Sequence, residues 1–258
     1  MNPKRDLKST LKSLAASVLP RNSFPGSNVA QLFLNGGGIE TEFTFTNIAS
    51  LYSPKTGQAY VYTLSLHDGD GHRVRSTVVT VPVHGTRALR LSEVMKSPLP
   101  ERGLLAVSLR SASALFYGDK HLGRVNPHFY ALYRSVESGS YALIHPQAAT
   151  GATPVPAGEW RSTQLIDTAR VRSLRIFQIN PCFSPATTSL RLCGLDGEVL
   201  QESTATLPPL SSRQVEWPLF DFTARPFVVV GMKGLPGPNS KPLVFNVFFD
   251  GSFSASHG

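Results

Sequence analysis

Two stretches of the sequence share the pattern Gly-Ser-aromatic-x-x-x-His and so repeat a histidine, the side chain whose charge changes near neutral pH. They are GSYALIH at 139–145 and GSFSASH at 251–257. In one interpretation, His145 and His257 face a shared site as an acid–base pair or as metal ligands. In the other, Gly-Ser forms a turn, the aromatic residue begins a strand and the histidine ends it. Duplication alone explains the recurrence, so the structural interpretation is preferred, and a histidine-dependent enzyme is kept as the alternative.

The spacing of the remaining ligand-type residues assigns no metal. The segment HDGDGH at 67–72 is rich in carboxylates but departs from the D-x-D-x-D-G-x5-E spacing of a calcium loop. Asp-Gly pairs of this kind are typical of tight hairpin turns. The motifs HxH, HExxH and CxxC do not occur in the chain. We therefore expect no cofactor and leave the metal ligands unassigned.

A ligand-binding surface is predicted in the segment FYGDKHLGRVNPHFY at 116–130, which mixes aromatic rings with cationic side chains. Rings beside cations suit acidic glycans, whereas the alternative is an ordinary Ω-loop with half-buried aromatics. Arg87 and Arg213 follow Thr86 and Ser212 at matching positions, where they either bind anions symmetrically or solubilise a strand edge. The candidate ligand-binding residues are Tyr117, Lys120, His121, Arg124, His128, Arg87 and Arg213.

Alternation of apolar and polar residues predicts β-strands from residue 29 onward. Examples are ETEFTFTN at 40–47 and AYVYTLSL at 59–66, with DGDG at 68–71 as a hairpin turn. The stretch VTVPVHGTRALRL at 79–91 aligns without a gap to ATLPPLSSRQVEW at 205–217. We predict an all-β protein of two tandem, internally duplicated antiparallel β-sandwich units, at 29–146 and 161–258. The Pro-, Gly- and Ala-rich segment 147–160 is predicted to be the linker.

The first 28 residues are predicted to form a short amphipathic helix and a loop. Apolar side chains recur at i, i+4, i+7 and i+11, and lysines gather on another face. Such a helix either docks across the body of the protein or touches an acidic membrane surface through residues 4–19. Three lysines are a weak membrane signal, so docking is preferred.

The overall composition favours a binding protein with an anionic partner. The chain has 258 residues, 41% of them hydrophobic, and a formal net charge of +8. This charge suits an anionic glycan or a protein partner, and nucleic acid ranks lower because the arginines are scattered along the strands. No stretch approaches the length of a membrane span, so a cytoplasmic location is expected. The leading hypothesis is non-catalytic recognition of an anionic ligand through sandwich loops, with the oligomeric state left open.

Overall fold

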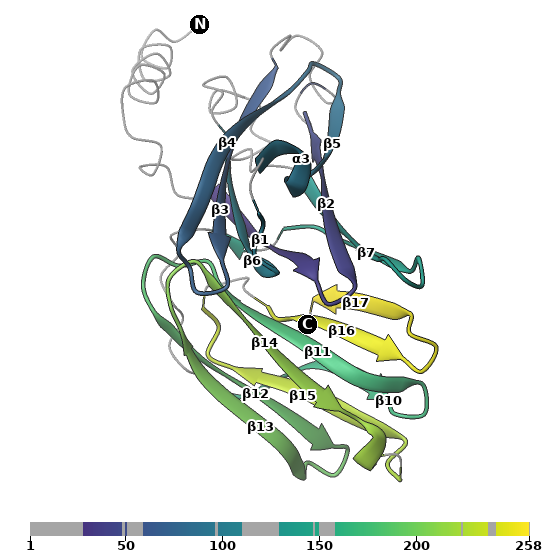
Figure 1. Ribbon diagram of the computed structural model, residues 1–258. Helices are drawn as coiled ribbons and strands as arrows, with labels where there is room; N and C mark the ends of the chain where they lie inside the picture. The colour runs from purple at the N-terminus through teal and green to yellow at the C-terminus, as the bar shows by residue number, and fades with distance from the viewer. Residues whose placement is uncertain are drawn as a thin grey trace, which may run out of the picture.

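The computed structural model describes residues 28–47, 50, 59–95, 98–109, 129–146, 148–149, 158–222, 224–236 and 241–257. This part of the chain is nearly all β-structure, arranged in antiparallel sheets, as the alternating sequence pattern predicts (Figure 1). None of its helices is long and apolar enough to cross a membrane. The predicted N-terminal helix, including residues 4–19, lies outside the described residues.

The strands of the N-terminal half, residues 28–149, form one nine-stranded sheet, which we divide at the β1–β2 pair into sheet 1 and sheet 2. Sheet 1 has the order β4-β3-β6-β1 and sheet 2 the order β5-β2-β7-β8, and the β1–β2 pair (Asn35 with Glu40) connects them. The strand β9 pairs with β1 and lies in the segment predicted to be the linker. The elements are β1 (Asn28–Gly36), β2 (Ile39–Thr46), β3 (Tyr60–Asp68), β4 (Arg73–Val81), β5 (Thr86–Arg90), α3 (Leu91–Met95), β6 (Arg102–Leu109), β7 (Phe129–Ser135), β8 (Tyr141–Ile144) and β9 (Ala148–Ala149).

The C-terminal half, residues 158–257, contains two four-stranded antiparallel sheets. Sheet 3 has the order β13-β12-β15-β10 and sheet 4 the order β14-β11-β16-β17. Each position corresponds to a strand of sheet 1 or sheet 2 in the same chain order. The elements are β10 (Arg161–Asp167), β11 (Val171–Asn180), β12 (Ala186–Gly194), β13 (Val199–Leu207), β14 (Ser211–Pro218), η4 (Phe220–Phe222), β15 (Phe227–Lys233), β16 (Leu243–Phe248) and β17 (Phe253–His257).

Two Asp-Gly hairpins mark equivalent turns in the two halves. Gly71 joins β3 to β4 with φ +90°, and Gly197 joins β12 to β13 with φ +85°. Positive φ is strained for side chains with a Cβ, which is why glycine occupies both turns. In the first turn, Oδ1 of Asp68 accepts hydrogen bonds from the backbone N–H groups of Asp70 and His72. The hairpin predicted at DGDG is thus present.

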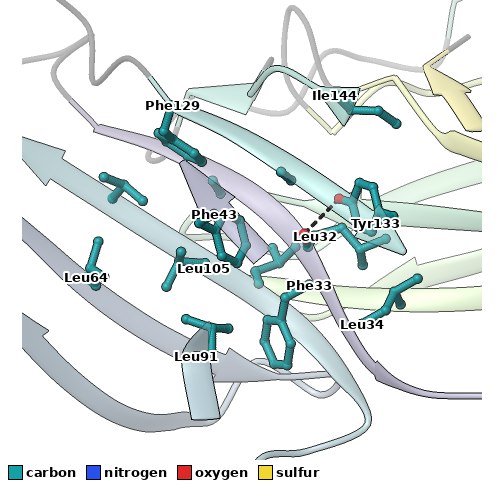
Figure 2. Packing of buried hydrophobic residues seen from close by; sticks show 14 of the residues in the cluster. Leu32, Phe33, Leu34, Phe43, Leu64, Leu91, Leu105, Phe129, Tyr133 and Ile144 are labelled. Atoms are coloured by element: carbon teal, nitrogen blue, oxygen red, sulfur yellow. Dashed lines mark hydrogen bonds between the residues drawn. The ribbon is translucent and has the colours of Figure 1, made fainter. Parts of the chain in front are cut away.

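The main hydrophobic core of the N-terminal half continues into the C-terminal half. It includes Phe43 and Tyr133 from sheet 2 together with Phe177, Phe245 and Phe253 from sheet 4. Figure 2 shows part of this cluster, in which the Tyr133 hydroxyl donates to the carbonyl oxygen of Leu32 at 2.8 Å. The same hydroxyl accepts a hydrogen bond from Nε2 of Gln31. Burial raises the pKa of Tyr133, so this ring stays neutral and serves as a structural anchor.

Sheet 4 has buried apolar residues on both faces and forms a middle layer between sheet 3 and the N-terminal half (Figure 1). On β11, Leu174 and Ile176 belong to the core shared with sheet 3, whereas Phe177 and Ile179 belong to the core shared with the N-terminal half. Successive side chains of a strand point to opposite faces of the sheet. A strand that is covered on both faces therefore needs apolar residues at both odd and even positions. The apolar run in β11 meets that need.

Candidate functional site

Most of the ligand-binding residues predicted from the sequence lie outside the described residues. These are Tyr117, Lys120, His121, Arg124 and His128. The last two residues of the segment 116–130, Phe129 and Tyr130, are the first two residues of β7.

The two remaining predicted ligand residues, Arg87 and Arg213, make equivalent contacts in the two halves. Nη1 of Arg87, on β5, donates to the carbonyl oxygen of Thr80 on β4 at 3.4 Å. Nη1 of Arg213, on β14, donates to the carbonyl oxygen of Thr204 on β13 at 3.2 Å. Each guanidinium therefore ties an edge strand of one sheet to an edge strand of the facing sheet. Anion binding by these arginines stays a prediction.

Both copies of the Gly-Ser-aromatic-x-x-x-His motif form a turn followed by a strand. Gly139 and Gly251 have φ of +69° and +82°, and the aromatic residues Tyr141 and Phe253 begin β8 and β17. The aromatic rings differ in environment, because Tyr141 is 69% exposed and Phe253 only 6%. Phe253 packs in the shared core, whereas the corresponding face of sheet 2 is open to solvent.

The two motif copies touch each other. The backbone N–H of Phe253 donates to Oγ of Ser140 at 3.1 Å. The imidazole rings of His145 and His257 lie edge to face, with centroids 5.1 Å apart and planes at 73°. His145 is exposed and His257 half-buried. The fold thus brings together the two histidines whose pairing the sequence left as an alternative.

The surroundings of the two imidazoles differ. Nδ1 of His145 lies 3.3 Å from the carbonyl oxygen of Pro146. Nδ1 of His257 is buried and has no hydrogen-bond partner in another described residue. Burial lowers the pKa of His257, and the positive charges of His145 and Lys241 lower it further. His257 is therefore held in its neutral form, which can accept a proton or a metal ion.

No Asp or Glu among the described residues forms a cluster of potential ligands with the two histidines. Within the described ranges, the group of three potential ligands that lies close together is Asp68, Asp70 and His72, away from the histidine pair along the chain. That group is explained by the turn, since Asp68 caps the backbone N–H groups of the other two residues.

A pocket that the sequence analysis missed opens on the outer face of sheet 2. Its volume is about 330 Å³, within the lower range of ligand sites. Glu42 pairs with Arg90 at 3.3 Å and Glu40 with Arg134 at 3.2 Å. The lining residues are Phe33, Leu34, Asn35, Glu40, Thr41, Glu42, Arg90, Leu91, Ser92, Leu99, Leu132 and Arg134.

Exposed apolar side chains continue the same face beyond the pocket. The register places Tyr141 beside Arg134 and Leu143 beside Leu132, so these four residues share one face of sheet 2. Leu143 is 57% exposed, and Val136, in the turn between β7 and β8, is 62% exposed. We call the surface made by Glu40, Glu42, Arg90, Leu132, Arg134, Tyr141 and Leu143 the sheet 2 face.

Comparison of the chain with models of protein families, and with curated proteins, gave no match.

His67 gives the fold a pH dependence that can be tested. The ring is buried, and its Nδ1 lies 3.1 Å from the carbonyl oxygen of Gly71. Burial lowers its pKa, with Arg73 acting in the same direction and Gly71 and Asp68 opposing. The folded-state pKa of His67 lies below its unfolded-state value. The stability that the neutral ring contributes is therefore fully present above about pH 6.5, and it is lost as the pH falls toward the folded-state pKa.

We therefore expect the free energy of unfolding, measured by urea titration, to decrease between about pH 7.5 and about pH 5. His67→Gln should show a smaller decrease than the wild type. His72→Gln is the matched control, because the His72 side chain is 82% exposed, and it should keep the full decrease. An undiminished pH dependence in His67→Gln would contradict the assignment.

Proposed function

We propose that this protein is a non-catalytic interaction protein that binds an acidic segment of a protein partner on the sheet 2 face. The observation that carries the proposal is the exposed pair Tyr141 and Leu143 beside Arg134 and the pocket. Apolar patches rimmed by charge mark interaction sites, and Tyr and Arg are enriched among interface hot spots. The net charge of +8 favours an acidic partner through electrostatic steering.

The pocket favours a peptide segment over a glycan. Its aromatic lining residue, Phe33, is fully buried and offers no ring face on which a sugar could stack. Leu91, Leu99 and Leu132 instead provide apolar contacts for an inserted side chain. Glu40 and Glu42 hold the guanidinium groups of Arg134 and Arg90 at the rim, where partner carboxylates would compete for them.

The proposal also rests on the chain being two copies of one β-sandwich, at 29–146 and 161–258. The repeated strand pairing, the gapless match of 79–91 to 205–217 and the equivalent contacts of Arg87 and Arg213 support this duplication. In the C-terminal copy, the outer face of sheet 4 packs against the N-terminal half. The corresponding face of the N-terminal copy is the sheet 2 face, which lies exposed. One copy thus uses this face inside the chain, and the other presents it to a partner.

The other hypotheses have less support. The ring contact of His145 and His257 favours a histidine-dependent enzyme, but neither ring lines the pocket, and the ligand cluster among the described residues does not include them. Glycan recognition through residues 116–130 stays a prediction, because most of that segment lies outside the described residues.

Arg134→Glu should weaken the binding of an acidic peptide by at least about tenfold, because a reversed charge replaces a central cation of the interface. The probe is a fluorescein-labelled peptide of alternating Glu and Leu, and the measurement is fluorescence anisotropy on the full chain. The affinity of the wild type should fall with added salt. A peptide with Lys in place of Glu should bind more weakly.

Arg172→Glu is the matched control, since it reverses another exposed charge, on β11 and outside the sheet 2 face. It should retain most of the affinity. If both variants lose affinity equally, the affinity depends only on net charge, and the sheet 2 face is not the binding site. If an acidic oligosaccharide binds while the acidic peptide does not, the glycan hypothesis replaces this one.

A further inference from the structure

We infer that His145 and His257 bind one divalent transition-metal ion that bridges the two halves of the chain. A Zn–N bond of about 2.0–2.1 Å places the centre of an imidazole ring roughly 3.2 Å from the ion. Two imidazoles at a tetrahedral angle then have centroids roughly 5 Å apart. The observed separation of the ring centroids, 5.1 Å, agrees with this value.

The hydrogen bonding of the two rings suits metal ligation. Histidines that bind metals commonly donate their second ring N–H to a backbone carbonyl, which fixes the tautomer. Nδ1 of His145 is positioned to donate to the carbonyl oxygen of Pro146, which leaves its Nε2 as the free lone pair. Nδ1 of His257 is buried and forms no hydrogen bond with another described residue. A bound metal ion would give this nitrogen the interaction that it lacks.

The donor set selects the class of ion. Among the described residues, the two imidazoles belong to no cluster with a carboxylate. Such a donor set suits Zn²⁺, Cu²⁺ or Ni²⁺, whereas Ca²⁺ and Mg²⁺ require oxygen ligands. The positive charge of Lys241 acts on the ring of His257, opposes the binding of a cation and limits the affinity. Water or an exogenous donor would fill the remaining coordination positions.

A bridging ion would join the ends of β8 and β17. The existing contact between these strands includes the hydrogen bond from the N–H of Phe253 to Oγ of Ser140. Because both histidines reach the ion only when the halves are docked, the folded chain binds it more tightly than the unfolded chain does. The metal therefore stabilises the folded state by mass action.

The experiment titrates the full chain with ZnCl₂ and CuSO₄ and measures stoichiometry by calorimetry and Tm by differential scanning fluorimetry. One equivalent should bind and raise Tm. His145→Gln and His257→Gln should each weaken binding by at least about tenfold and remove the Tm increase. The electron paramagnetic resonance spectrum of the Cu²⁺ form should show coupling to two nitrogens in the wild type and to one in either variant.

His72→Gln is the control, because it removes the other described histidine that lies among potential ligands. It should bind like the wild type. The proposal is overturned if binding survives in both His145→Gln and His257→Gln, if His72→Gln abolishes it, or if one equivalent binds without raising Tm. His145 is exposed, so its variant folds, and metal-free Tm values confirm that point for each protein.

Discussion

Replacing Phe245 with Ala lowers the free energy of unfolding by about 3–5 kcal/mol, the cost typical of a large aromatic side chain removed from a core. Phe245 is fully buried on β16. Its ring contacts those of Tyr133, Phe177 and Phe253 at centroid distances of 5.2, 5.3 and 5.4 Å. Since Tyr133 belongs to the other half, the cavity would open at the junction itself.

The measurement is urea unfolding followed by both circular dichroism and tryptophan fluorescence. Because the halves share one core, we expect a single transition in the wild type with the two signals coinciding. Phe249→Ala is the control: Phe249 is 57% exposed, and its loss should change stability by less than about 0.5 kcal/mol. Two separated transitions in the wild type, or a small effect of Phe245→Ala, would mean that the junction is not part of the core.

Gly71→Ala destabilises the protein much more than Gly197→Ala. The two glycines occupy equivalent hairpins with φ of +90° and +85°, so both variants incur the cost of a Cβ at positive φ, roughly 1–2 kcal/mol. A Cβ at Gly71 would also meet the backbone carbonyl oxygen of Pro209 at 2.1 Å. A Cβ at Gly197 meets nothing within 4 Å. The excess for Gly71→Ala should be about 1–3 kcal/mol or more, as expected for overpacking against rigid backbone.

This comparison isolates the docking of the first hairpin on the turn between β13 and β14. The same contact includes a hydrogen bond from the N–H of Ser212 to the carbonyl oxygen of Gly69 at 3.0 Å. Free energies of unfolding from urea titration of the two variants, measured side by side, provide the test. Equal losses in both would show that turn strain accounts for the whole effect and that the hairpin contact contributes nothing.

The sequence was sufficient for most of the strands and for the Asp-Gly turns, because both depend on neighbours along the chain, but it predicted neither β9 nor the short helix α3. Alternation in β2 puts Phe43 and Phe45 on the buried face, as its pattern predicts. The two cysteines, Cys182 and Cys193, are buried free thiols. The alternation of apolar and polar residues that predicts a strand can be read from a single sequence.

The candidate sites depend on contacts between distant segments, and the sequence left them open. The approach of His145 to His257 follows from how the halves dock, which no local pattern specifies. The pocket was missed although Glu40 and Glu42 alternate on a predicted strand, since nothing local shows that Arg90 and Arg134 lie opposite them. The contrast between exposed Tyr141 and buried Phe253 likewise arises from docking. The apolar residues at both odd and even positions of β11 were the sequence feature that could have predicted a strand packed on both faces.

The shared core has a consequence for biosynthesis. Phe245 and Phe253 enter that core from strands near the end of the described chain, long after the N-terminal half has left the ribosome. At about 5–20 residues per second, synthesis of the C-terminal half takes roughly 5–20 s. Throughout that interval the apolar surface of the N-terminal half that receives sheet 4 is uncovered. We expect nascent chains to need a chaperone during this window, and fragments ending before β16 to aggregate.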